Sequence, residues 1–343
     1  MSALQQMLFA AAAKLQQIAL AHNDSPYVSA YPWSGSGFGT KFANPSTLPI
    51  GTGNGVAFPS AGNAIAVSHA TTPYVSAYPW SGSGFGTKFA NPSTLPTGIG
   101  NGVAFTSAGD AIAVSHATTP FVSTYPWSGS GFGIKFANPA TLPAGPGSGV
   151  AFTSAGDAIA VAYVSNSPYI SAYPWSGSGF GTKFANPATL PPDDGEGVAF
   201  SSAGDAIAVA HGSSPAVSAY PWSGSGFGTK FANPATLPIG NGLGVAFSPA
   251  GNAIAVVNDS ASPYVSAYPW SGSGFGTKFA NPVTLPPDIG YGVAFTKASD
   301  AIAVAHDGSP YVSAYPWSGS GFGTKFANPA TLPTGTGNGV AFN

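Results

Sequence analysis

The chain has 343 residues, of which 6% are charged, and its nine basic residues are all lysine, for a formal net charge of −2. Nucleic-acid binding requires a concentrated basic surface, so the composition excludes that class of partner. Hydrophobic residues make up 44% of the chain, too many for a disordered protein, and the absence of cysteine excludes disulfides and thiolate metal sites.

Residues 1–14 differ from everything that follows. Leu4, Met7, Leu8 and Ala11 have helical spacing among good helix formers, so we expect a short amphipathic helix. The apolar patch over 7–13 follows no positive charge and is shorter than the roughly 20 residues that span a bilayer. We therefore expect synthesis in the cytosol without a signal peptide, and no membrane insertion.

From residue 15 onward the chain repeats itself. Each repeat contains nearly the same text, such as SPYVSAYPWSGSGFGTKFANP over 25–45. One tryptophan marks each of the seven copies, at intervals of 47 or 48 residues: Trp33, Trp80, Trp127, Trp175, Trp222, Trp270 and Trp317. Self-similarity at such a period is typical of architectures in which every repeat is one small structural unit.

Each repeat is predicted to contain four short antiparallel strands. In the second repeat they cover 55–58 (GVAF), 64–69 (AIAVSH), 74–80 (YVSAYPW) and 86–91 (GTKFAN). The connections are short and rich in Gly, Asn and Pro, which favours turns between antiparallel neighbours. Alternation gives the second strand a bulky face with Ile65 and Val67 and a small face with Ala64 and Ala66, so neighbouring repeats can interlock.

The two ends of the chain indicate a closed ring. The last residues, 339–343 (GVAFN), are a first strand without a second, whereas 17–22 (QIALAH) are a second strand without a first. Pairing them leaves no unpaired sheet edge at the chain ends. The sequence therefore predicts an all-β fold, a closed seven-bladed β-propeller over residues 15–343, with the C-terminal strand innermost in the blade that the N-terminus begins.

The segment 244–258 (GVAFSPAGNAIAVVN) resembles the first two strands of a WD40 blade, and the third strand ending in Trp270 is similar to that family's tryptophan position. Ser34 and Ser81 stand where the family has Asp after Trp, so the family's buried Trp–Ser–His–Asp network is not implied. The near-identical copies also resemble propeller repeats of tailed-phage proteins. This resemblance implies a virion or extracellular surface location after assembly. We expect the helix over residues 1–14 either to cap the ring or to dock it onto other virion or surface proteins.

The residues that could carry chemistry recur from repeat to repeat, which argues against a single active site. The lysine of each expected outer strand, such as Lys88, either protects the edge from aggregation or forms a basic ring. His69 and its equivalents are expected to form local hydrogen bonds, and Asp110 and its equivalents to hold turns. We therefore expect no catalytic residue, no cofactor and no metal site.

Two sets of loops vary between repeats: the connection to the next repeat, and the loop between the second and third strands. In a propeller these sets share one face, and variable loops on a rigid scaffold are a usual place for binding, although loops also tolerate drift. If this face binds a ligand, its distinctive residues are Asp193, Asp194, Glu196, Asp288 and Tyr291.

Three functions follow from these patterns. The missing catalytic motif and the phage resemblance favour a non-enzymatic binding or structural protein, above all a phage virion appendage that recognises a receptor. One alternative is a multivalent lectin, whose seven tryptophans stack on cell-surface glycans and gain avidity from repetition; a competing interpretation buries those tryptophans between blades. Another alternative is an intracellular protein-interaction scaffold, disfavoured because arginine is common in interface hot spots.

Overall fold

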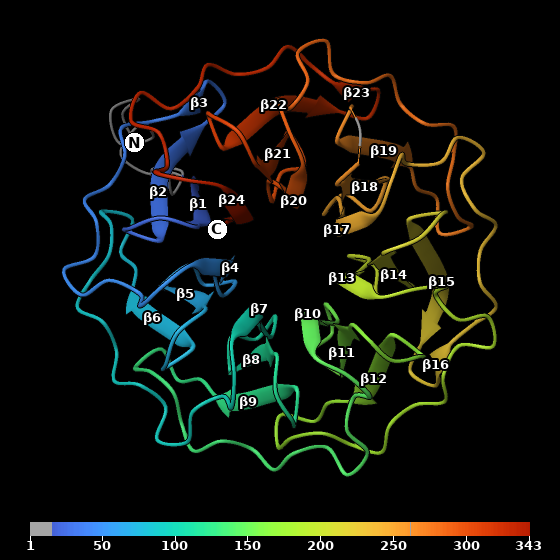
Figure 1. The fold of residues 1–343 in the computed structure, drawn as a ribbon, viewed down its shortest axis with the longest axis horizontal. Helices are drawn as coiled ribbons and strands as arrows, with labels where there is room; N and C mark the ends of the chain where they lie inside the picture. The colour runs from blue at the N-terminus through green and yellow to red at the C-terminus, as the bar shows by residue number, and fades with distance from the viewer. Residues whose placement is uncertain (1–15, 261) are drawn as a thin grey trace, which may run out of the picture.

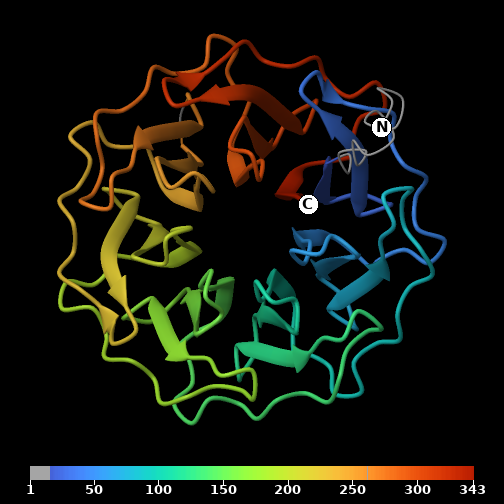
Figure 2. The same cartoon turned by 180° about the vertical axis from the view of Figure 1, so that it is seen from behind.

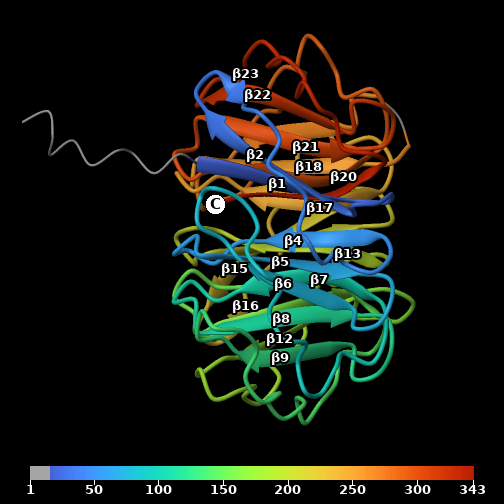
Figure 3. The ribbon, with the colours of Figure 1, turned by 90° about the vertical axis from the view of Figure 1, so that its left-hand side faces the viewer.

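A computed structural model describes residues 16–260 and 262–343 of the chain. Seven small antiparallel sheets surround a central opening (Figure 1), and the same closed ring is seen from behind (Figure 2). Viewed from the side, the ring has loops along its two opposite faces (Figure 3). The all-β seven-bladed propeller is thus confirmed, whereas the helix expected over 1–14 lies outside the described residues. Within those residues, no helix has the length and apolar character needed to cross a bilayer.

Every blade has an inner, a middle and a third strand. The inner strands line the opening and are β4 (Gly53–Ala57), β7 (Gly100–Phe105), β10 (Gly147–Phe152), β13 (Gly195–Phe200), β17 (Gly242–Phe247), β20 (Gly290–Phe295) and β24 (Gly337–Phe342). The middle strands are β5 (Ala64–His69), β8 (Ala111–His116), β11 (Ala158–Tyr163), β14 (Ala206–His211), β18 (Ala253–Asn258), β21 (Ala301–His306) and β1 (Gln16–His22). The third strands are β6 (Val75–Pro79), β9 (Val122–Pro126), β12 (Ile170–Pro174), β15 (Val217–Ser223), β19 (Val265–Pro269), β22 (Val312–Ser318) and β2 (Val28–Ser34).

The ring closes as the sequence predicts. The C-terminal strand β24 pairs antiparallel with β1, so one blade has the order β24-β1-β2-β3, where β3 is Gly37–Phe38. The labelled C-terminus lies at this blade, beside β1 (Figure 1). The exchange turns an open stack of repeats into a ring whose terminal blade has the same inner pairing as the other six.

Neighbouring blades interlock, a large face against a small one. Ile65, Val67 and Trp80 of one blade pack on Ala19 and Ala30 of the blade before it. Because alanine leaves room for the larger side chains, the two sheets approach closely, and the contact repeats around the ring. The predicted alternation of bulky and small faces is confirmed.

The fourth strand is shorter than predicted. The segment 86–91 is not a strand, and in four blades the fourth position is only a bridge, such as Trp80 to Phe85. Three blades have a two-residue strand there: β3, β16 (Gly226–Phe227) and β23 (Gly321–Phe322). In the second blade, Gly86 N–H donates to Pro79 O. The second hydrogen bond of this antiparallel pair is missing, because Pro79 has no N–H to donate to Gly86 O. The proline before each tryptophan therefore interrupts the ladder, and beyond it a single bond remains, from Phe89 N–H to Ala77 O at 2.9 Å in this blade.

Candidate functional site

The two variable loop sets lie on one face, as predicted, because hydrogen bonds join them in several blades. Ala70 N–H, in a loop after a middle strand, donates to Thr52 O in a loop before an inner strand at 2.9 Å. Gly212 N–H donates to Asp194 O at 2.9 Å in the same way. We call this side of the ring the mouth face.

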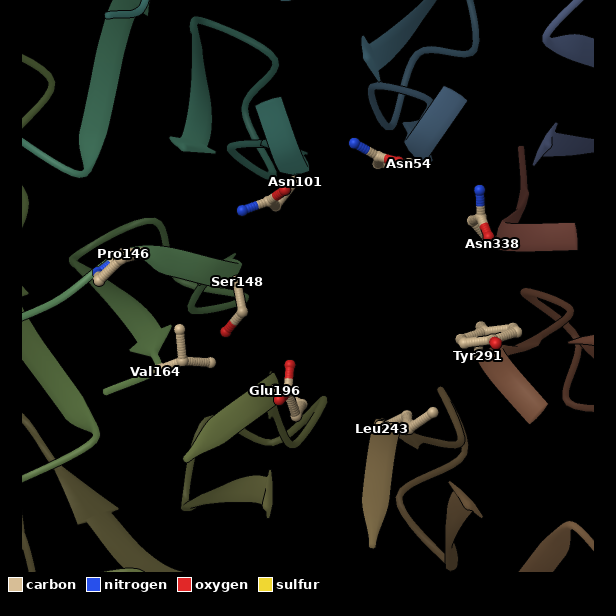
Figure 4. A pocket seen from close by; sticks show the side chains of 9 residues that line it. All are labelled: Asn54, Asn101, Pro146, Ser148, Val164, Glu196, Leu243, Tyr291 and Asn338. Carbon is tan, nitrogen blue, oxygen red and sulfur yellow. The ribbon is translucent and has the colours of Figure 1, made fainter. Parts of the chain in front are cut away.

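A cavity of about 460 Å³ lies at the centre of the mouth face, where the inner strands begin (Figure 4). We call it the mouth pocket. Its lining residues are Asn54, Asn101, Pro146, Ser148, Val164, Glu196, Leu243, Tyr291 and Asn338. Seven of these nine come from one repeat position, the residue between the two glycines of the GxGVAF segment that forms each inner strand.

Each of these seven residues lies in a β-bulge. In the blade of β13, Gly195 pairs with His211 and Gly197 with Ala210, so Glu196 has no partner on the middle strand. The same register shift occurs at the start of every inner strand. A bulge re-aims the extra side chain, and here it places one side chain from every blade around the opening (Figure 4).

The glycines on either side of the bulge are sterically required. A Cβ added to Gly195 would lie 2.3 Å from Tyr169 O, and one added to Gly197 would lie 3.1 Å from Gly244 Cα in the next blade. Below the mouth pocket the opening narrows to a space of about 230 Å³, lined by the glycine and valine of each GVAF segment together with Leu243 and Tyr291. Close contacts therefore require glycine at the two flanking positions, whereas the bulged position between them accepts a different side chain in different blades.

Several bulged residues are hydrogen-bonded to the next blade. Asn54 Nδ2 donates to Gly100 O at 2.9 Å, and Asn101 Nδ2 donates to Gly147 O at 2.8 Å. Ser148 donates its hydroxyl to Gly195 O, and Asn338 Nδ2 continues the series to Gly53 O. An ionised carboxylate has no proton to donate. Glu196 can therefore join this series only when it is protonated.

Glu196 is the one carboxyl group among the lining residues that the structure describes. Burial, followed by the nearby carboxylates of Asp194, Asp259 and Asp193, raises its pKa from 4.5 to about 7. Burial also raises the pKa of the Tyr291 phenol, with a further contribution from nearby aspartates. At neutral pH the pocket thus holds one carboxyl group that exchanges its proton readily and one phenol that keeps its proton.

Of the five loop residues predicted from the sequence, two line the mouth pocket and three lie in the loops beside it. Glu196 and Tyr291 line the mouth pocket, whereas Asp193, Asp194 and Asp288 lie in the loops before β13 and β20. The other five bulged residues were missed, although the signal was available, because they are the variable position between invariant glycines in each GxGVAF segment: Asn54, Asn101, Ser148, Leu243 and Asn338.

The tryptophans are in the core, so the sugar-stacking prediction is wrong in its geometry. Their exposed fractions are only 3–6%. Trp80 is enclosed by the edges of Phe42, Phe58 and Phe85, with ring centroids 5.0–5.6 Å away, and its equivalents have matching neighbours. A ligand has no open indole face to stack on, and the competing interpretation of an inter-blade core is confirmed.

The other repeated polar residues serve the scaffold. His69 Nε2 lies 3.0 Å from Ser76 Oγ, which confirms the local role expected for the histidines. Thr106 Oγ1 accepts the Asp110 N–H at 3.1 Å and donates to its carboxylate, which confirms the turn role of the aspartates. Lys88 donates to Asn91 on the outer segment. In the described part of the chain, no three His, Asp or Glu side chains are grouped so as to hold a metal ion.

Comparisons with known proteins show a shared fold. A protein from Bacteroides fragilis assigned as a 6-phosphogluconolactonase has a TM-score of 0.76 and 11% identity, covering 97% of this chain and 99% of its own. A Bacteroides uniformis protein with the same assignment has a TM-score of 0.71 and 12% identity, covering 96% and 100%. The periplasmic gluconolactonase of Pseudomonas aeruginosa also has a TM-score of 0.71 and 12% identity, covering 95% and 99%. No family model and no curated protein matches the chain.

These comparisons overturn the expectation of a non-enzymatic phage appendage. The solved proteins above, which share the fold over nearly the whole chain, are named as lactonases, and a lectin or an intracellular scaffold fits no better. The expectation depended on the absence of a contiguous catalytic motif. In this ring, residues almost 50 positions apart in the sequence meet at one mouth, so a site needs no contiguous motif.

Proposed function

We propose that this chain is a hydrolase of small sugar lactones that acts in the mouth pocket, with Glu196 transferring the protons. The observation that carries the proposal is the Glu196 carboxyl group in that pocket, whose pKa of about 7 lies near neutral pH. A general base is most effective when its pKa lies near the pH at which it works. Perturbed carboxyl groups in a cavity are common at catalytic sites.

The chemistry needs only water as a second reactant. The ionised Glu196 carboxylate takes one proton from a water molecule as the water oxygen forms a bond with the lactone carbonyl carbon. The ring C–O bond then breaks, and the leaving oxygen takes the proton back from Glu196. The products are an open-chain hydroxy acid and an unchanged enzyme. The Tyr291 hydroxyl, which stays protonated, is suited to donate to the carbonyl oxygen while negative charge develops there.

Size and polarity of the pocket support the same substrate class. About 460 Å³ falls within the range of small-molecule sites. The amides of Asn54, Asn101 and Asn338 give one side of the mouth a polar lining suited to sugar hydroxyls, while Leu243 and Tyr291 give the other an apolar surface. The lactonase names of proteins with this fold agree with the assignment.

The test is hydrolysis of glucono-1,5-lactone by the full-length protein, measured as residual lactone at pH 6–8 and corrected for spontaneous hydrolysis. We expect kcat/KM to rise with pH through about 7, because the base must be ionised. Glu196→Gln should lower kcat by about 10²–10⁴-fold, the usual contribution of a general base. Asp110→Asn, on the opposite face and matched to the natural Asn63, should leave the rate unchanged.

Folding of each variant is checked by its thermal melting curve. A wild-type rate equal to the spontaneous rate for a panel of five- and six-membered sugar lactones would overturn the proposal. A folded Glu196→Gln variant with the wild-type rate would also overturn it, because Glu196 could not then be the proton-transferring group.

A further inference from the structure

Five aspartates surround one side of the mouth pocket. They come from both variable loop sets in three consecutive blades, and we call them the acidic arc: Asp193, Asp194, Asp259, Asp288 and Asp307. The corresponding positions in the blades of β4 and β7 hold neutral residues, such as Gly51, Thr52 and Ala70, and the blade of β24 has a single aspartate on this face, Asp24. The charge is therefore concentrated on the side that supplies Glu196, Leu243 and Tyr291.

Hydrogen bonds hold these carboxylates in place. Asp194 accepts the Ser165 N–H at 2.6 Å, and Asp259 accepts both the N–H and the Nδ2 of Asn241 at 3.0 Å. Asp307 accepts the Thr336 hydroxyl at 2.7 Å and the Gly308 N–H at 2.8 Å.

Most of the arc is held in its ionised form. The Ser213 hydroxyl, followed by the Asp194 N–H, lowers the pKa of Asp193. Thr336 and then Gly308 lower that of Asp307. Burial works against ionisation of Asp259, but its hydrogen bonds from Ser260 and Asn241 outweigh it and lower the pKa. These three groups are fully charged at neutral pH.

The field of the arc reaches the pocket. The aspartates 193, 194 and 259 disfavour a negative charge on Glu196, and the aspartates 259, 288 and 307 disfavour one on Tyr291. None of the nine lining residues is a lysine, so the pocket offers no compensating cation. The aspartates of the acidic arc therefore repel an anion that enters the mouth pocket.

We infer that the acidic arc makes the mouth pocket selective for uncharged lactones and expels the anionic product. The inference rests on the proposed lactone hydrolysis. A sugar lactone is neutral, whereas the hydroxy acid formed from it ionises near pH 3.5–4 and leaves as a carboxylate. A phosphorylated lactone carries charge from the start. The arc therefore assigns the unphosphorylated lactone as substrate, and it favours release of each product molecule over its retention.

The first measurement compares gluconamide with gluconate as ligands of the full-length protein by calorimetry, because the two differ mainly in charge. Charges are screened over about 8 Å in physiological salt but over about 30 Å at about 0.01 M, so we expect the neutral ligand to bind on the order of tenfold more tightly at low salt. The difference should shrink in 0.5 M NaCl. In turnover, we expect gluconolactone to be preferred over its 6-phosphate and product inhibition to be weak.

The second measurement uses the variant D193N/D194N/D288N/D307N, which keeps an acceptor oxygen at each site. It leaves Asp259 intact, because both of its carboxylate oxygens accept from Asn241. We expect gluconate binding to strengthen on the order of tenfold while gluconamide binding stays unchanged. The matched control, D110N/D157N/D205N, removes three charges from the turns of the opposite face, where Asn63 and Asn252 occur naturally. It should leave both affinities unchanged.

The outcomes separate the inference from the proposed function. Equal affinities of the wild type for the two ligands, or a preference for gluconate, would overturn the inference even if lactones are hydrolysed. A charge preference that disappears only in the arc variant, without any hydrolysis, would support the inference and reject the proposed reaction. Binding of neither ligand would overturn the inference, and the hydrolysis assay alone would then decide the proposed function.

Discussion

The buried histidines should make the ring unstable in mild acid. They lie at the ends of the middle strands, fully buried, each with Nε2 at 2.9–3.0 Å from a serine Oγ of the third strand: His22, His69, His116, His211 and His306. Burial lowers the pKa of the first four from 6.5 to about 4, and it lowers that of His306 as well. The unfolded chain therefore takes up protons near pH 6.5, well before the folded one does. The stability that these groups contribute is complete above pH 6.5 and is lost as the pH falls toward 4.

The loss of unfolding free energy follows from the difference between the unfolded and folded pKa values. A pKa change from 6.5 to about 4 corresponds to about 3 kcal/mol per histidine at pH 4, and to about 2 kcal/mol at pH 5. Four such groups sum to about 8 kcal/mol at pH 5, which is within the total unfolding free energy of ordinary domains. Glu196, whose pKa is raised, stabilises the folded state as the pH falls. It is a single group, so the unfolding free energy still decreases from pH 7 to pH 5. We expect the unfolding free energy to fall by about 4–8 kcal/mol between pH 7 and pH 5.

The assay is guanidinium unfolding at pH 7, 6 and 5, followed by the fluorescence of the seven buried tryptophans. His116→Asn, matched to the natural Asn258, should remove about one fifth of the pH dependence, and replacing all five histidines should remove nearly all of it. Asn258→His should add a sixth buried histidine and increase the pH dependence of the unfolding free energy by about one fifth. An unfolding free energy that is constant from pH 7 to 5, or a slope that survives the five-site replacement, would refute the reasoning.

Three further predictions concern stability. Glu196→Asn should raise the unfolding free energy by about 1–3 kcal/mol at pH 8 and not at pH 4.5, because a carboxyl group with a raised pKa destabilises the fold only above its unfolded value; equal gains at both pH values would contradict this. Gly197→Ala should cost about 1–3 kcal/mol, since its Cβ meets the next inner strand, whereas Gly35→Ala, with no atom within 4 Å of the new Cβ, should melt like the wild type. Thr106→Ala should cost about 1–2 kcal/mol, because two backbone N–H groups lose their acceptor, and Thr106→Ser should restore most of it. Thermal melting measures the last two.

The ring was predictable because its determinants are local and repeated. Strand alternation, glycine turns and the 47-residue period all appear within one repeat, and the orphan strands at the two ends leave closure as the way to pair them. The outer strand was overestimated because its pattern fits a strand. Whether a ladder continues depends on a hydrogen bond from the third strand, and Pro79 cannot provide it.

The site was only half predictable for a different reason. Glu196 and Tyr291 were identified because they are unusual residues in variable loops, and the mouth face was inferred correctly from propeller topology. The bulge that brings all seven positions together is a property of strand register, which depends on contacts such as that of Gly53 with Tyr27 O in the neighbouring blade. The raised pKa of Glu196 depends partly on Asp259, which is far away in the sequence. Such contacts become visible only once the ring is assembled.

The near-identity of the blades supports the proposed place of the site. A ring of seven equal units presents equal surfaces, so it can orient an asymmetric substrate only where its copies differ. The two glycines of each GxGVAF segment lie against the neighbouring blades, which leave no room for a side chain there, whereas the bulged position between them holds Asn, Ser, Glu, Leu or Tyr. Divergence is thus tolerated where the side chain faces the opening and opposed where it would separate the blades. The symmetry that argued against an enzyme describes the scaffold, and the broken symmetry at the mouth is what a catalytic site on this scaffold requires.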